Sequence, residues 1–402
     1  MPILSETVRR IRKSGGNVTL KQSQWGSWPW SPTSITGKNV NDQSAVGLPA
    51  FYRGVTLIAR TLGGLPPQVF HEEIGPDGVE GKTTKLKTLD TQYLWLRPNN
   101  EMTKQAFWER IFADLVRGNA YIWVEKDDIG RPLSIWHIER RRVRVGRTAS
   151  LQKVYELDGE LPMIDYKDGG EIVHIPNWGD SLVGYDPVSI ASEAIALGLS
   201  AQEYAARSIA EGSVPPGILS VEMVLTPEEA AEISEAWHAR PPNKAAVLGN
   251  GAKFQHINLE PEKLQLEQLR KFQNTQIATL LGLPPFLLGD MDHASQGGGN
   301  GLEEQNRLLI QFNFQGHTNA VEQAVSDSLL VRELTGRYMR VSYGGLLRGT
   351  TLQRYQALRI ADFMTINEKR ALEELEPLPD GDELLAPLNL APLDQLGVIN
   401  TP

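Results

Sequence analysis

The 402-residue sequence contains no cysteine. Disulfide bonds, thiolate metal sites and a cysteine nucleophile are therefore excluded. The sequence also lacks any run of about 18 apolar residues, the length that a transmembrane helix needs. Its N-terminus, MPILSETVRRIRKSGG, has no continuous apolar stretch of the kind found in signal peptides. These absences predict a soluble, intracellular protein that does not interact with a membrane.

The chain also has no excess of positive charge. The formal net charge is −9, whereas proteins that coat nucleic acid are usually basic. A protein that encloses DNA without gripping it remains compatible with this charge. Hydrophobic residues make up 41% of the chain and charged residues 22%, as in ordinary globular proteins. The length is sufficient for two or three domains.

The motifs of common enzyme classes are absent. The segment GPDGVEGKTT resembles a phosphate-binding loop, but Pro76 stands where that motif requires glycine, and Gly75 comes one residue too early. A hairpin tip explains this segment better. The seven histidines form neither HExxH nor His-x-His, and no GxSxG motif occurs. We therefore expect neither an enzyme nor a bound cofactor or metal.

Hydrophobic periodicity predicts an α+β domain after an N-terminal arm. Residues 14–47 lack periodicity and contain Trp25, Trp28 and Trp30, so we expect an arm with little structure that docks on its own domain or on a neighbouring subunit. Residues 49–64 and 103–117 show amphipathic helical spacing, with Thr103 as the N-cap of the second helix. Short alternating runs then predict several antiparallel strands up to about residue 180.

The second half of the chain reads mainly as helices. Long helices are expected at 187–212, 261–282 and 302–331, and two short ones within 351–376. Residues 213–257 read as a strand, a helix capped by Thr226 with Glu229, and a second strand. The first long helix is rich in alanine and predicts close contact with neighbouring helices. Its stripe comprises Ile190, Ala194, Leu197, Ala201, Tyr204 and Ala205.

An arginine cluster supplies the strongest local positive charge. In strand geometry, three of its members, Arg140, Arg142 and Arg144, would share one face. The cluster also includes Arg141 and Arg147. Two interpretations stay open here: an electrostatic contact with DNA or an acidic neighbour, and a solvated sheet face.

Residues 272–301, FQNTQIATLLGLPPFLLGDMDHASQGGGNG, form the most informative segment. An amphipathic helix stops at Pro284 and Pro285, and a loop with three consecutive glycines precedes the next helix. Because glycine has the widest backbone freedom, the loop suits a moving element at the edge of a cavity. Asp290, Asp292 and His293 in this loop could bind a cation weakly, although an ordinary loop explains them better.

This segment, and five others in the same order, resemble the portal proteins of tailed bacteriophages. The other segments are VTLIARTLGGLPPQVF, LRPNNEMTKQAFWERIFADLVRGNAYIWVEKD, EIVHIPN with GYDPVSIASEAI, SVPPGILSVE, and MTINEKRALEELEPLPDGDELLAPLNL. The resemblance covers the chain from about residue 48 and is poor before it. It implies a ring-forming α+β portal fold with a wing, two stem helices, a clip, a tunnel loop and a crown side.

The resemblance divides the chain into eight parts. They are a flexible N-terminal arm (1–47), the wing (48–186), the first stem helix (187–212), the clip (213–260), the second stem helix (261–285), the tunnel loop (286–301), a channel-to-crown helix with a wing strand (302–350), and C-terminal crown-side helices with a tail (351–402).

The resemblance also implies function, partners and site residues. The expected protein is a dodecameric ring at one capsid vertex of the virion, assembled in the host cytoplasm. It would be the channel for packaging and ejection of double-stranded DNA. Expected partners are the terminase large subunit, the major capsid protein, head-completion or adaptor proteins, and further copies of this chain. The expected tunnel-loop residues are Asp290, Asp292, His293, Gln296, Gly297, Gly298, Gly299 and Asn300. The expected clip residues for partner docking are Glu228, Glu229, Glu232, Glu235 and the pair Gly249-Asn250.

Three alternatives remain at this point. One is a different phage neck or minor head protein, which is usually shorter. Another is a hydrolase using Asp290, Asp292 and His293. The third is a monomeric interaction protein from a prophage remnant. Size in solution separates them, since a portal sediments as a very large ring.

Overall fold

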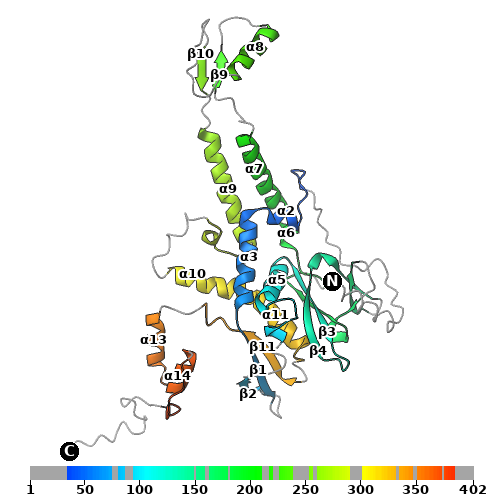
Figure 1. The fold of residues 1–402 in the computed structure, drawn as a ribbon, viewed down its shortest axis with the longest axis vertical. Helices are drawn as coiled ribbons and strands as arrows, with labels where there is room; N and C mark the ends of the chain where they lie inside the picture. Colours follow the sequence, from blue (N-terminus) through cyan, green and yellow to red (C-terminus); the bar gives the residue numbers. More distant parts are fainter. Residues whose placement is uncertain are drawn as a thin grey trace, which may run out of the picture. The chain divides into compact units, whose positions relative to one another are not determined.

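The computed structural model describes residues 34–74, 80–86, 94–148, 151–158, 163–179, 182–210, 217–220, 226–238, 253–256, 260–289, 301–331, 335–346, 351–373 and 375–384. The chain divides into two compact units, Met1–Val341 and Ser342–Pro402. Figure 1 gives the labels of helices and strands.

Two amphipathic helices form the helical layer of the first unit. Helix α3 (Pro49–Gly64) begins with proline at its first position and buries Phe51, Ile58 and Leu62. Helix α5 (Lys104–Val116) packs against α3. As predicted, Thr103 caps it: its hydroxyl accepts the backbone N–H of Ala106. The helical faces read from the sequence are therefore the buried faces.

The strands that follow α5 in the sequence form two antiparallel sheets. Strand β3 (Asn119–Lys126) pairs with β4 (Pro132–Ile138) on one side and β8 (Ile172–Pro176) on the other. Strands β5 (Val143–Arg147), β6 (Lys153–Leu157) and β7 (Met163–Ile164) form the other sheet. Between them lies a core that includes Tyr121, Trp123 and Tyr155. The short 3-10 helix η3 (Tyr166–Asp168) precedes β8. The predicted α+β class is confirmed.

A third sheet joins distant parts of the chain. Strand β1 (Pro67–Ile74) pairs antiparallel with β2 (Glu80–Lys85) and with β11 (Arg337–Val341), so the order is β11-β1-β2. The segment that resembled a phosphate-binding loop is thus part of a hairpin, as predicted, although residues 75–79 at its tip lie outside the described residues.

The first long helix is not continuous. Residues 187–212 were predicted as one helix, but α6 (Pro187–Ile190) and α7 (Ser192–Ala210) are separated at Ala191, whose φ and ψ are −96° and 25°. Asp186 caps α6 by accepting the backbone N–H of Val188. Helix α9 (Glu260–Leu280) packs against α7 and against α3, so α9 links the two.

The small α/β element predicted within residues 213–257 is present. Strands β9 (Gly217–Ser220) and β10 (Lys253–His256) pair antiparallel, and α8 (Pro227–His238) lies between them in sequence. The predicted capping box is confirmed: the Thr226 N–H donates to the Glu229 carboxylate at 2.9 Å, and the Glu229 N–H donates to the Thr226 hydroxyl at 3.4 Å.

The helix predicted for residues 302–331 changes its winding midway. It consists of α10 (Gly301–Leu309), one π-helical turn, η6 (Ile310–Phe314), and α11 (Gln315–Ser328). Before it, the 3-10 helix η4 (Pro285–Leu288) begins at the second proline of the pair, with Pro284 as its N-cap. In the second unit, α13 (Thr351–Ile360) and α14 (Ile366–Leu372) match the two predicted short helices.

The predicted arm is more structured than its composition suggests. Residues 14–47 were expected to have little structure, yet α2 (Asp42–Val46) forms with a capping box between Asn41 and Ser44. A five-residue helix is too short to show a hydrophobic period, which is why the pattern did not predict it. Residues 1–33 lie outside the described residues.

Candidate functional site

The arginine cluster forms a turn rather than one face of a strand. Residues Arg140–Arg142 make the 3-10 helix η2, and only the residues from Val143 onward continue as β5. Arg140 is buried and forms ion pairs with Asp42 of α2 and, at 3.5 Å, with Asp186 at the start of α6. Arg141 Nε donates to Asp42 at 2.9 Å. Both earlier interpretations are wrong for Arg140, because its partners are acidic groups of its own chain.

Three elements meet at the positive charge of Arg140. Burial lowers the pKa of Arg140, but the carboxylates of Asp186 and Asp42 outweigh it and raise that pKa above its ordinary value. The guanidinium therefore stays charged and holds α2, η2 and the N-cap of α6 together.

Helices α6 and α7 expose an apolar stripe. Ile190 on α6 and Leu197 and Tyr204 on α7 follow at seven-residue intervals, and their exposed fractions are 47%, 38% and 52%. Leu197 and Tyr204, seven residues apart on α7, lie on nearly the same face of that helix, whereas Ile190 lies on α6, before the break at Ala191. Exposed apolar stripes of this kind mark protein contact surfaces. We define these three residues as the α6–α7 stripe.

A side chain from η6 hydrogen-bonds backbone carbonyl groups at the C-terminal end of α9. Asn313 donates its side-chain amide to the carbonyl oxygens of Leu281 at 2.6 Å and Gly282 at 2.8 Å. These are carbonyl groups that a helix end leaves without partners. Gly282 has φ of +64°, and a Cβ there would lie 2.3 Å from Asn313 Nδ2. The π-helical turn therefore places Asn313 where only glycine leaves room for it.

The predicted tunnel-loop residues cannot be placed. All eight, from Asp290 to Asn300, lie outside the described residues. The described chain reaches Gly289, where φ is +97°, and resumes at Gly301 in α10. Their assignment remains a prediction.

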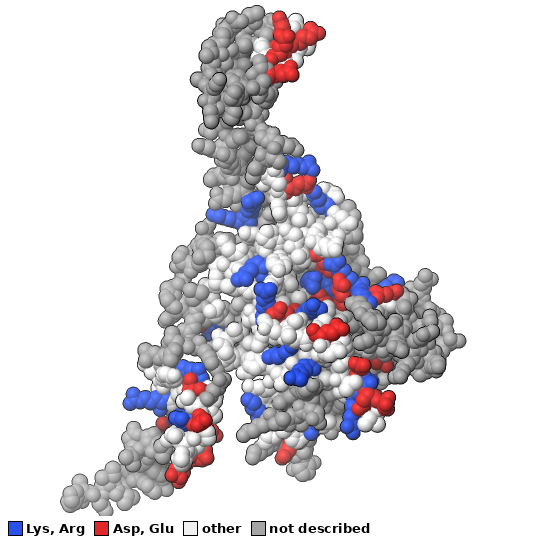
Figure 2. Space-filling view, in the orientation of Figure 1, with Lys and Arg blue, Asp and Glu red and all other residues white. Residues whose placement is uncertain are grey.

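The four glutamates predicted as clip residues are exposed on α8, and the predicted pair Gly249-Asn250 lies outside the described residues. Glu228, Glu232 and Glu235 follow with spacings of four and three residues and so share one face. Glu229 instead caps the helix: the N–H and hydroxyl of Thr226 lower the pKa of its carboxyl. Figure 2 shows the acidic side chains gathered on α8.

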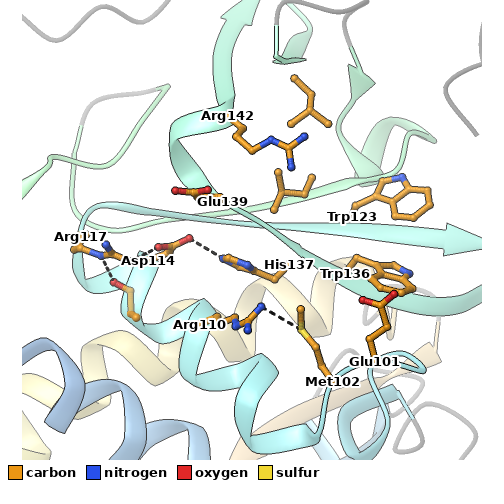
Figure 3. A pocket seen from close by; sticks show the side chains of 13 residues that line it. Glu101, Met102, Arg110, Asp114, Arg117, Trp123, Trp136, His137, Glu139 and Arg142 are labelled. Atoms are coloured by element: carbon orange, nitrogen blue, oxygen red, sulfur yellow. Dashed lines mark hydrogen bonds and ion pairs between the residues drawn. The ribbon is translucent and has the colours of Figure 1, made fainter. Parts of the chain in front are cut away.

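The structure also contains a pocket that sequence reasoning missed. It has a volume of about 430 Å³ and lies between α5, the strands β3 and β4, and η2. Inside it, His137 Nε2 bonds Asp114 at 2.7 Å, and Arg117 pairs with the other oxygen of Asp114 at 2.5 Å (Figure 3). Its residues are spread from position 101 to 157 without a motif, so no local signal marked it.

Other classes of site find no support in the described part of the chain. The described residues contain no group of three or more His, Asp or Glu side chains placed to hold a metal ion. Among the described helices, none is both long and apolar enough to cross a bilayer.

Comparison with known proteins identifies the family. A family model described as phage portal protein matches residues 49–374, which is more than half of the chain. The portal protein of Enterobacteria phage HK97 is 28% identical over 400 residues, covering 96% of this chain and 93% of its own length. A probable portal protein of Streptomyces phage phiC31 is 28% identical over 381 residues, covering 89% and 81%.

A solved structure shows the same fold. The neck of a native gene transfer agent particle, computed with C12 symmetry, contains a chain with a TM-score of 0.59 and 19% identity. The match covers 93% of this chain and 100% of that one. The fold and the family model agree, and the family is structural rather than enzymatic. The chain belongs to the phage portal protein family.

Proposed function

We propose that this chain forms a ring of about twelve copies at one capsid vertex, in keeping with the C12 symmetry of the related neck. The ring is the channel through which double-stranded DNA enters and later leaves the head. The observation that carries the proposal is the α6–α7 stripe, because neighbouring exposed apolar side chains are typical of protein contact surfaces. A neighbouring copy would cover the stripe.

The acidic character of the subunit suits translocation. DNA carries about one negative charge per 1.7 Å of its axis, and a basic channel would accumulate contacts and resist sliding. In this proposal the ring is passive, and a separate terminase ATPase supplies the force. The stem surfaces that face the axis therefore carry few lysines or arginines. Several basic rings on those surfaces in an assembled structure would contradict this part.

The first experiment is negative-stain electron microscopy of the purified full-length protein, with native mass spectrometry to count subunits. Rings of about twelve subunits with an open centre, as in the C12 neck, are the expected result. A monomer or dimer at high concentration in the presence of capsid partners would overturn the ring.

The acidic face of α8 is proposed to dock the terminase large subunit and then the head-completion or adaptor proteins. Reversing charge at Glu228, Glu232 and Glu235 together tests this, because all three are exposed and none caps the helix. The triple lysine variant should still form rings but should retain much less terminase in a pull-down. Asp128→Lys, at an exposed position in the turn between β3 and β4, provides a control outside this face. Equal retention by both variants would refute the docking assignment.

The glycine loop is proposed to move against the duplex inside the channel and help retain it. Replacing Gly297, Gly298 and Gly299 with proline removes the backbone freedom that such movement needs. We expect intact rings and a loss of DNA-filled heads. Normal heads from this variant would exclude the loop from DNA handling while leaving the ring proposal intact.

A further inference from the structure

The pocket beside α5 has the composition of a docking site for an aromatic anchor. Its floor is apolar and includes Trp123, Trp136, Ile138 and Leu157. Its volume of about 430 Å³ falls within the range of ligand pockets. Apolar floors with charged rims are typical of sites where one aromatic side chain supplies most of the binding energy.

Three charged side chains of the rim form no ion pair in the described part of the chain. Within the described part of the chain, Glu101 and Glu139 form no ion pair, and the only hydrogen bond of Arg110 is to the Met102 sulfur at 4.0 Å. The rim therefore offers two acceptors and one cation to an occupant.

The N-terminal segment is already attached to the wall of this pocket. Asp42 binds Arg140 and Arg141, the two residues between Glu139 and Arg142, which both line the pocket. Going backwards along the chain, Lys38 pairs with Glu203 of α7. The segment then turns back, because the N–H of Ile35 donates to Glu193 near the start of α7 at 2.9 Å.

The anchor at Ile35 leaves a short length of chain between it and the tryptophans. Its partner Glu193 is seven residues after Asp186, across α6 and the break at Ala191. Asp186 in turn contacts Arg140, the neighbour of the rim residue Glu139. Trp30 is five residues before Ile35, and five extended residues reach about 17 Å. Trp25 is ten residues before Ile35, and ten extended residues reach about 34 Å, so the length of this segment permits a tryptophan to meet the pocket of its own chain.

The composition of this segment complements the pocket. Residues 25–30 read WGSWPW, and Trp28 and Trp30 lie two apart around Pro29. Residues 1–33 contain five basic side chains and one acidic one, which suits the two unpaired glutamates of the rim. The basic residues are Arg9, Arg10, Arg12, Lys13 and Lys21, and the acidic one is Glu6.

We infer that a tryptophan of residues 25–30 inserts into the pocket between α5 and η2 of its own chain. In this inference the indole ring rests on the apolar floor, its N–H donates to a rim glutamate, and Arg110 lies against its face as a cation–π partner. Figure 3 shows the pocket side chains that would receive it. The segment thereby fastens the N-terminal arm across the wing. Neither the ring nor the channel is needed for this contact.

The absence of cysteine makes a direct test possible. Ser27→Cys and Asn100→Cys, the latter at an exposed position beside the rim residue Glu101, are introduced into the full-length protein, which is treated with a short bis-maleimide. The expected product is a cross-link within one chain, identified by peptide mass spectrometry and by migration as a single chain in a denaturing gel. Ala113→Trp, which fills the pocket from α5, should lower the yield about tenfold, as expected for loss of one anchor.

Two controls separate docking from general disturbance. Gln105→Trp adds the same side chain to an exposed position of α5 outside the pocket and should leave the yield unchanged. Replacing Trp25, Trp28 and Trp30 with alanine leaves the pocket untouched and should also lower the yield about tenfold, so the test stands even where Ala113→Trp fails to fold. Absence of any cross-link, a cross-link only between chains, or equal yields from all variants would overturn the inference.

Discussion

At the scale of single residues, Arg140 holds one buried positive charge where three segments meet. Its partners, Asp42 and Asp186, come from positions 98 residues before it and 46 after it along the sequence. Removing one member of a buried pair leaves the other charge without compensation, which is far more costly than losing an exposed pair.

Arg140→Ala should therefore lower the free energy of unfolding by about 3–5 kcal/mol. Arg144→Ala is the matched control, because the Arg144 side chain is 64% exposed and its ion pair with Glu156, at 3.8 Å, lies at the surface. The control should change stability by less than about 1 kcal/mol. Urea titrations of both variants measure the difference, and equal losses would contradict the role given to Arg140.

His174 is the second residue whose surroundings determine a measurable property. It stacks on Tyr121 at 4.6 Å, and Tyr155 meets it edge-on at 5.6 Å. Its Nδ1 accepts from Lys153 at 3.2 Å, and its Nε2 donates to Asn119 at 2.9 Å. Burial, and then the positive charge of Lys153, hold the pKa of His174 well below 6.5.

The sign of the pH effect follows from this. Below pH 6.5 the unfolded chain binds a proton at His174, whereas the folded chain does not, so stability falls with falling pH. From pH 6.5 to 5.5 the wild type should lose about 1 kcal/mol more than His174→Gln. Glutamine retains one donor and one acceptor but does not titrate. Parallel pH profiles of the two proteins would contradict the prediction.

At the scale of elements, the close approach of α3 to α5 is possible because residue 63 is glycine. A Cβ on Gly63 would lie 2.8 Å from the backbone nitrogen of Glu109 and 3.2 Å from its Cα. The backbone of α5 cannot rotate away as a side chain could. A Cβ on the next residue, Gly64, would have no atom within 4 Å among the described residues.

Gly63→Ala should accordingly destabilise the protein by about 1–3 kcal/mol, the usual cost of overpacking. Gly64→Ala should be neutral or stabilise it by up to about 1 kcal/mol, because alanine favours the helix. Thermal unfolding of the two variants provides the comparison. A loss of similar size in both would mean that helix contact does not determine the cost.

At the scale of the whole molecule, the α6–α7 stripe is the surface on which the proposed ring depends. Leu197→Asp with Tyr204→Asp should leave the single chain folded, since both side chains are exposed, and should weaken subunit association at least about tenfold. Ala206→Asp is exposed and lies about 200° around α7 from Tyr204, so it should leave association unchanged. Native mass spectrometry reports the change, and wild-type rings from the double variant would remove the stripe from the interface.

The sequence by itself determined the class of the fold and most of its helices. Periodicity located α3, α5 and α9, and the caps Thr103 and Thr226 are where local hydrogen bonding required them. These features depend on neighbours within four residues, so they can be read without a tertiary structure. The six segments that resemble the portal family, in their order along the chain, can also be read from the sequence. The family match confirmed this resemblance. The loop residues 290–300 remain a prediction.

Only the tertiary structure decided the features that join distant residues. The sequence left Arg140 open to a contact with DNA or an acidic neighbour, or to a solvated sheet face, whereas the structure pairs it with Asp42 and Asp186. The break at Ala191 and the π-helical turn at Ile310–Phe314 arise in stretches whose composition suits a continuous helix. The pocket beside α5 collects residues from position 101 to 157. Burial and cross-element contact depend on which surfaces meet, and that is a property of the packed chain rather than of any local stretch.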